Sequence, residues 1–314
     1  MENLVFCLNA TIPIFLTMLL GILFRHIGLF DEAFTAKLNR FVFLIALPAL
    51  LFSDLSGVPF QQVWDGRFVF FCFSVTLLSI LIACLLSLVC CERSCRSEFV
   101  QASYRSSAAI LGIALIQNLY GNDGMAPLMI VSSVPLYNIM AVVVLTLLKP
   151  EPQPLTADTV RQTVLGILKN PILLGIAAGL LWSLFGIPQP HIMQLTVKNL
   201  AALATPLGLM VMGASFDIKK VGTKLCPVLL AGAVKLLLFC ALFLPLAVHM
   251  GFHHDKLIAI LVMLGSSTTV SCYIMARNMG HEGSLTSGAI MFTTFFSAFT
   301  LTGWLYLLRS FGLI

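Results

Sequence analysis

The sequence predicts an all-α integral membrane protein with ten transmembrane helices, arranged as two inverted five-helix repeats in which helices four and nine are broken and crossed. Three observations support this prediction. Hydrophobic residues make up 59% of the 314-residue chain and charged residues only 10%, whereas a soluble domain is about half apolar and about a quarter charged. Apolar stretches long enough to cross a bilayer recur along the chain. Short sequence motifs in the first half of the chain also recur in the second half at a nearly constant spacing.

Ten apolar stretches are candidate membrane spans, because a helix needs about 20 apolar residues to cross the hydrocarbon core. The stretch behind Met1 is as long as a full span and lacks the basic start of a secretory signal. We therefore predict that it is a retained first helix. The predicted spans are Leu4–Phe24, Ala33–Phe52, Phe68–Val89, Phe99–Tyr120, Gly124–Leu148, Val164–Phe185, Leu195–Phe216, Leu225–His249, Lys256–Met275 and Leu285–Leu308.

Lysine and arginine are distributed unevenly over the predicted loops. Of the 18 basic residues, thirteen lie in or beside the odd-numbered loops, four lie on the opposite side, and Lys235 falls inside a span. Cytoplasmic loops of membrane proteins carry an excess of Lys and Arg. We therefore predict a multi-pass protein of the cytoplasmic membrane, with its odd-numbered loops in the cytoplasm and both termini outside.

Four pairs of sequence marks relate the two halves of the chain. The members of each pair are 158 to 160 residues apart: Pro13 with Pro171, Pro48 with Pro206, Ser106 with Ser266, and Gly121 with Gly280. An odd number of spans in each unit forces the second copy to lie upside down, and inverted repeats are a recurrent plan of secondary transporters. The predicted domains are a first repeat (1–149), a proline-containing cytoplasmic linker (150–163) and a second, inverted repeat (164–314).

The fourth and ninth spans contain polar runs that are unusual for membrane helices. Ser and Thr compete for backbone hydrogen bonds and Gly adds flexibility. We therefore expect both helices to be discontinuous and to meet near the middle of the bilayer, where their broken ends would offer N–H dipoles and hydroxyls to an anion. The alternative is that these small residues only permit close helix packing. The predicted substrate-binding residues are Ser106, Ser107, Ser266, Ser267 and Thr268.

Two basic side chains inside the spans are further candidates. Lys235 is predicted deep in the membrane, where a cation costs about 2.5–3.5 kcal/mol on insertion scales. It either attracts the anionic solute as a charge partner or pins a helix through backbone carbonyls. Arg105 lies nearer the cytoplasmic end of its span, so we predict a role for it as a gate or a lipid-headgroup contact. The acidic residues, Asp54 among them, are predicted near span edges, which argues against a cation as the primary substrate.

Other classes of function lack support in the sequence. No Lys/Arg-rich run indicates nucleic-acid binding, and no phosphate-binding loop or HExxH pair is present. No residues suggest nucleophilic catalysis, so we predict neither an enzyme nor a cofactor. The nine cysteines lie mostly in apolar segments, where free thiols behave as small hydrophobes. The spacing of His249, His253 and His254 does not predict a metal site.

The chain resembles the auxin efflux carrier (AEC) family over essentially its whole length. The most specific stretch is LNRFVFLIALPALLF (38–52), followed by Arg105-Ser106, Asn170-Pro171 and the segment 206–213. The resemblance implies ten spans in two inverted repeats, crossed helices four and nine, and transport of organic anions. Bacterial relatives are associated with malate, malonate and similar carboxylates, and plant relatives with auxin.

The chain departs from the family at Ser107, where Asn is common, and at Ala114 and 266–269, where Pro is frequent. Its short linker favours a likeness to the bacterial malate or malonate permeases.

We therefore predict a secondary transporter that moves a small organic anion, such as malate, malonate or an auxin-like weak acid, by alternating access. The alternative is a membrane receptor or scaffold that binds a small ligand without transporting it. The expected partners are the anion and the lipid bilayer, and not nucleic acid. The coupling ion (proton or sodium) and the formation of a homodimer stay open at this point.

Overall fold

All regular secondary structure is helical in the part of the chain that the computed structural model describes, namely residues 2–57, 64–108, 115–117, 119, 124–148, 165–166 and 168–314. These ranges contain no strand. Six helical runs within them are long and apolar enough to cross a membrane, and two shorter apolar helices accompany these runs, Ile12–His26 and Pro171–Leu184. The prediction of an α-helical membrane protein is confirmed. The count of ten spans stays a prediction.

The described helices follow the predicted spans, and several spans consist of consecutive segments. The elements are α1 (Glu2–His26), α2 (Glu32–Phe41), the π turn η1 (Val42–Ala46), α3 (Leu47–Ser56), α4 (Gly66–Cys90), the 3₁₀ turn η2 (Arg93–Cys95), α5 (Arg96–Tyr104), α7 (Ala126–Leu147), α9 (Pro171–Leu184), α10 (His191–Ala202), α11 (Ala204–Ala214), α12 (Ile218–Thr223), α13 (Leu225–Ala233), the π turn η3 (Val234–Leu238), α14 (Phe239–His249), α15 (His254–Gly265), α16 (Ser271–Asn278) and α17 (Ser284–Ser310). The turn η1 ends at Ala46, two residues before Pro48. Because Pro has no N–H for the i−4 carbonyl, a wider turn at this point absorbs the missing hydrogen bond.

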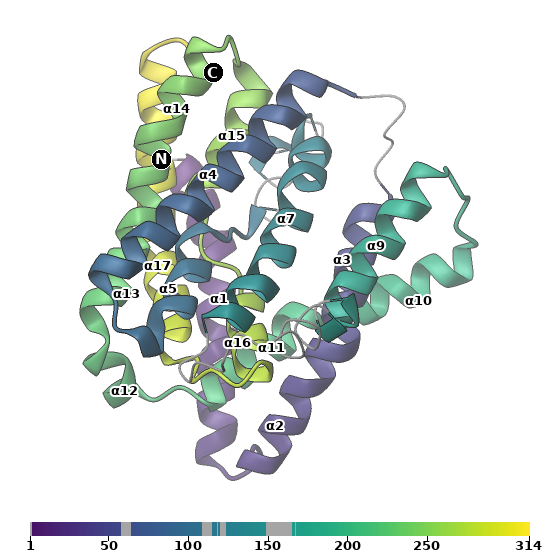
Figure 1. The fold of residues 1–314 in the computed structure, drawn as a ribbon, viewed down its shortest axis with the longest axis vertical. Helices are drawn as coiled ribbons and strands as arrows, with labels where there is room; N and C mark the ends of the chain where they lie inside the picture. The colour runs from purple at the N-terminus through teal and green to yellow at the C-terminus, as the bar shows by residue number, and fades with distance from the viewer. Residues whose placement is uncertain are drawn as a thin grey trace.

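The helices form two bundles that lie side by side. The first bundle consists of α1, α2, α3, α9, α10 and α11, in which α3 packs on α9 and α10 and α1 packs on α11. The second bundle consists of α4, α5, α7 and α13–α17, in which α4 packs on α5 and α7, and α13 packs on α17. In Figure 1, α3, α9 and α10 lie to the right of α4, α13 and α14. The bundles meet where α7 and α16 contact the first bundle and where α1 contacts α17.

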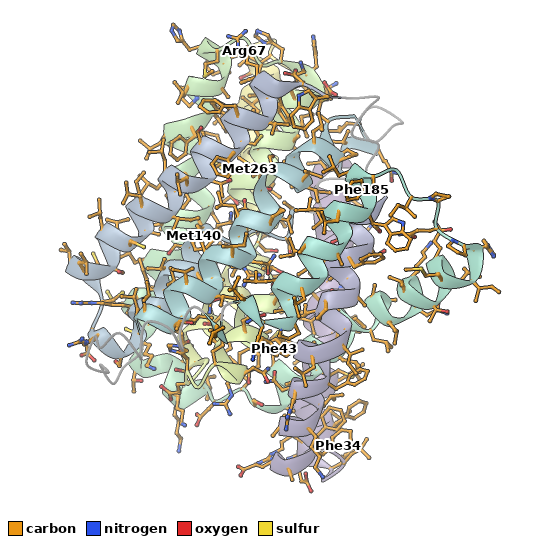
Figure 2. The ribbon with its side chains drawn as sticks, turned by 45° about the vertical axis from the view of Figure 1, so that its right-hand side comes forward. Phe34, Phe43, Arg67, Met140, Phe185 and Met263 are labelled. Atoms are coloured by element: carbon orange, nitrogen blue, oxygen red, sulfur yellow. The ribbon has the colours of Figure 1, made fainter. Side chains whose placement is uncertain are left out.

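The outer surface of both bundles is apolar. Large hydrophobic side chains project outward along the whole height of the helices, among them Phe70, Val89 and Ile192, which are 70%, 87% and 81% exposed. Figure 2 shows such side chains around the molecule between Arg67 at its upper end and Phe34 at its lower end. An apolar surface of this extent is stable only in contact with lipid or protein. The exposure pattern therefore agrees with a bilayer as solvent.

Glycines allow α9 to pack closely against α3 within the first bundle. A Cβ atom on Gly175 of α9 would lie 2.7 Å from the carbonyl oxygen of Pro48 on α3, and one on Gly179 would lie 3.0 Å from the carbonyl oxygen of Phe52. Small residues four apart on a membrane helix let two backbones approach in this way. Gly175 and Gly179 therefore form a packing motif between α9 and α3.

The contact between α1 and α11 is built in the same way. A Cβ atom on Gly21 would lie 2.1 Å from the carbonyl oxygen of Met210, and one on Gly213 would lie 2.1 Å from the carbonyl oxygen of Met18. If the chain is duplicated as predicted, α1 corresponds to α9 and α11 to α3, so the two glycine contacts occupy equivalent positions. The inverted repeat itself stays a prediction, and the predicted linker (150–163) lies outside the described residues.

An ion pair ties two helix ends together at the upper end of the molecule. Asp65 accepts hydrogen bonds from the backbone N–H groups of Arg67 and Phe68 at the start of α4, and Lys256 of α15 donates to the same carboxylate at 2.6 Å. The hydrogen bond from Lys256, together with the backbone donors, lowers the pKa of Asp65 below its ordinary value. Because Asp65 also caps the helix, α4 and α15 begin at a common level.

Substitution Gly175→Ala should destabilise the protein, because its methyl group would overlap the backbone of Pro48 and force α9 away from α3. The expected loss is about 1–3 kcal/mol, the usual cost of overpacking a filled contact, measured as a lower unfolding temperature in detergent. The control is Gly303→Ala on α17, where a Cβ atom meets no atom within 4 Å. Equal unfolding temperatures for both variants would show that the glycine contact does not limit stability.

Candidate functional site

The fourth span is interrupted directly after α5. The helix ends at Tyr104, and Arg105 has extended backbone angles (φ −73°, ψ 141°). Residues 105–107 are not helical. Hydrogen bonding by Ser103 to the carbonyl of Phe99 competes with the regular ladder in the last turn. The helix therefore stops within the membrane at the polar run that the sequence indicated.

The ninth span is interrupted at the corresponding place. The helix α15 ends at Gly265, Ser266 is extended (φ −74°, ψ 163°), and α16 begins at Ser271. The freed backbone groups find side-chain partners, since the N–H of Thr268 donates to the hydroxyl of Thr293 at 3.0 Å. A neighbouring helix thus satisfies groups that would otherwise be exposed to an apolar environment.

The two interruptions contact each other directly. The N–H of Ser107 donates to the carbonyl of Ser267 at 2.9 Å, and the hydroxyls of Ser106 and Ser266 share a short hydrogen bond. The hydroxyl of Thr268 donates to the carbonyl of Ala102 at 2.8 Å, which ties the second interruption to the last turn of α5. All five hydroxyl residues predicted from the polar runs therefore lie together at one junction.

Lys235 holds the carbonyl ends of both half-helices. Its fully buried ammonium donates to the carbonyls of Leu264 (2.7 Å) and Met263 (3.2 Å) at the end of α15, and to that of Tyr104 (3.4 Å) at the end of α5. A cation is favourable at a helix C-terminus because the helix dipole is negative there. Of the two roles left open for Lys235, the geometry fits the pin through backbone carbonyls.

Arg105 is a buried guanidinium held by uncharged partners. It is 1% exposed and donates to Asn138 Oδ1 and Ser271 Oγ, each at 2.7 Å, and to Met275 Sδ at 2.9 Å. Its Nε has no hydrogen-bond partner. Among the described residues no carboxylate lies within ion-pair distance of Arg105. A buried charge is normally paired. Arg105 therefore lacks the countercharge that a buried cation normally has.

A cavity of about 70 Å³ lies beside Arg105, between the two bundles. The second bundle contributes the first interruption, part of α7 and the start of α16, while the first bundle contributes α3 and the start of α11. The lining residues are Leu47, Leu50, Leu51, Asp54, Arg105, Ser106, Ser107, Val134, Tyr137, Asn138, Ala204, Thr205, Thr269, Val270, Ser271 and Ile274.

Sequence reasoning found part of this cavity lining. Arg105, Ser106 and Ser107 line the cavity, whereas Ser266, Ser267, Thr268 and Lys235 are not among the lining residues. The sequence analysis missed Asp54, Asn138, Thr205, Thr269 and Ser271. Asn138 could have been noticed as an amide inside an apolar span. Asp54 was placed at a span edge because the predicted span ended at Phe52, whereas α3 continues to Ser56.

A second, open cavity of about 970 Å³ lies on the side of the molecule predicted to be cytoplasmic. Its charged lining residues are Arg25, Arg40, Lys219, Lys220, Arg277, Glu32, Asp217 and Glu282. Lys224 also pairs with Glu282 and, by its hydrogen bond, lowers the pKa of that carboxyl. Cations outnumber anions in the lining, so the cavity attracts anions from solution. Within the described residues, no three His, Cys, Asp or Glu side chains are placed to hold a metal ion.

Substitution Lys235→Met should strongly destabilise the protein, because the carbonyl ends of α5 and α15 would lose their shared cation. Hydrogen bonds to charged groups contribute about 1.5–3 kcal/mol each, so we expect a clear drop in the unfolding temperature in detergent. The matched control is Lys198→Met on α10, where the side chain is exposed. An unchanged unfolding temperature for Lys235→Met would contradict the pinning role.

Comparison with known proteins agrees with these features. Residues 6–305 match the family described as membrane transport protein. No curated protein gives a significant match to the chain. The family match extends over both bundles and both interruptions, and it confirms the resemblance seen in the sequence. The chain therefore belongs to the auxin efflux carrier-type family of membrane transport proteins.

Proposed function

We propose that this membrane transporter is a secondary carrier of a small organic anion, with a carboxylate as the recognised group. The observation that supports this most directly is Arg105, a buried guanidinium that borders a cavity and has no carboxylate partner among the described residues. A guanidinium matches a carboxylate with two parallel hydrogen bonds. The negative charge that Arg105 lacks would be supplied by the solute.

The helix dipoles around the cavity support an anion as the solute. The first residue of α16, Ser271, lines the cavity together with Val270 and Thr269, so the positive N-terminal end of this half-helix borders the site. The negative C-terminal ends of α5 and α15 are instead bound by Lys235. The helix ends therefore contribute positive and not negative potential to the cavity.

The proposed contacts revise the roles suggested by the sequence. Arg105 takes the role of charge partner that we considered for Lys235, and the hydroxyls of Ser107 and Ser271 would donate to the solute oxygens. The hydroxyl of Ser106 lines the cavity but donates to the carbonyl of Val262. The proposal gives Ser266, Ser267 and Thr268 no direct contact with the solute. They position Ser106 and Ser107 through the junction.

Transport is proposed to proceed by alternating access, with the second bundle moving against the first. The cavity has about 70 Å³, whereas pockets that enclose small molecules usually measure about 300–1,000 Å³. The bundles must therefore separate to admit a solute. The proposed topology has ten spans in two inverted repeats, 1–149 and 164–314, with the solute bound at their interface. A receptor that only binds its ligand is not favoured, because the family is one of transporters.

The test is counterflow of labelled malate, malonate and indole-3-acetate in proteoliposomes. We expect saturable uptake of at least one of these acids, and we expect Arg105→Gln to reduce it by more than about tenfold, since a charge-assisted hydrogen bond contributes about 1.5–3 kcal/mol. The control Arg67→Gln removes an arginine that donates to the carbonyl of Met250, at the upper end of the molecule in Figure 2. It should transport at close to the wild-type rate.

Two outcomes would contradict the proposal. Wild-type protein that is folded but exchanges none of these acids would exclude carboxylate transport within the panel. Full activity of Arg105→Gln would show that the guanidinium does not bind the solute.

A further inference from the structure

Asp54 faces Arg105 across the cavity from the opposite bundle. It lies on α3 of the first bundle, whereas Arg105 lies at the interruption in the second bundle. Among the described residues that line the cavity, these two alone carry a formal charge. The two groups are not within ion-pair distance in this structure, and Asp54 has no ion-pair or hydrogen-bond partner among the described residues. Asp54 is therefore an unpaired carboxyl that lines the cavity of the proposed solute site.

The surroundings of Asp54 contain few other charges. Of the elements packed on α3, η1 and α9 carry no titratable side chain, and α7 contributes the uncharged Tyr137 to the cavity. The helix α10 carries His191 and Lys198, which are both exposed. Arg105 is thus the one charged group that shares the cavity with Asp54.

The charge balance of the cavity changes when an anion enters. With Asp54 ionised and Arg105 protonated the cavity is neutral, and an added carboxylate would leave an uncompensated negative charge inside the membrane. Such a charge is expensive in an apolar environment. A proton on Asp54 compensates one negative charge of the solute and also removes the carboxylate that competes with the solute for Arg105.

We infer that Asp54 is the proton-binding group that couples anion transport to proton movement. This inference rests on the proposed function. A proton from the water on the loading side binds a carboxylate oxygen of Asp54 as the solute carboxylate binds Arg105. On the opposite side the solute leaves, the O–H bond of Asp54 breaks, and the proton passes to water. By linkage, each ligand increases the affinity of the site for the other to the same extent.

The inference is tested with the carboxylate, malate or malonate, that the wild-type protein carries faster. Proteoliposomes contain a pH-sensitive dye, and the membrane potential is clamped at zero. We expect wild-type uptake to speed up as the external pH falls and to bring in about one proton per solute beyond the protons bound to the solute itself. Asp54→Asn should retain counterflow of the solute but lose the accompanying proton and the pH response.

The matched control is Asp31→Asn, the same chemical change outside both cavities. Asp31 caps α2 by accepting from the N–H of Phe34, and Asn is an equally good cap. The titration of the solute is common to all three proteins, so the difference between the two variants isolates Asp54.

The outcomes separate this inference from the function on which it rests. Absence of counterflow in the wild type overturns the proposed function. Counterflow with wild-type proton movement in Asp54→Asn overturns the role of Asp54 alone. If Asp54→Asn loses all flux, proton uptake on solute binding is measured with a pH indicator in weakly buffered detergent solution. Wild-type protein that binds the solute without taking up a proton also overturns the inference.

Discussion

The contact of one buried ammonium with the carbonyl ends of two half-helices is the interaction on which the site depends. An interrupted helix in a membrane leaves backbone carbonyls without partners, and each costs several kcal/mol in hydrocarbon. Lys235 satisfies carbonyls of both α5 and α15 at once. The hydrogen bond from the N–H of Ser107 to the carbonyl of Ser267 then fixes how the two interrupted spans cross. Without the cation, neither interruption would be stable at that depth.

The division of charges between the two sides of the junction is the physical basis of the anion selectivity that we propose for the site. Lys235 neutralises the negative helix ends, so the positive start of α16 and the guanidinium of Arg105 act on the cavity without opposition from those ends. Asp54 is the one countercharge there, and it belongs to the other bundle. A motion between the bundles would change the separation of Asp54 and Arg105, which provides a physical route from proton binding to movement of the solute.

The glycine contacts make the first bundle a compact partner for such a motion. Backbone-to-backbone approach at Gly175 and Gly21 leaves little freedom between α3 and α9 or between α1 and α11. The interface between the bundles is different in kind, since it encloses a cavity lined by side chains of both. Relative motion is therefore expected at the cavity and not inside the first bundle.

The sequence by itself determined the lipid environment, most helix positions and the two interruptions, because these follow from local composition: apolar runs of fixed length and clusters of Ser, Thr and Gly. It also placed Ser106 and Ser107 at the site and raised, as one of two roles, the carbonyl pin that Lys235 makes. Only the tertiary structure decided which carbonyls bind Lys235 and which charge faces the cavity. Asp54 and Arg105 are 51 positions apart and lie on different bundles. Both line one cavity only because of how the bundles pack, and the spacing of residues along the chain does not encode this packing.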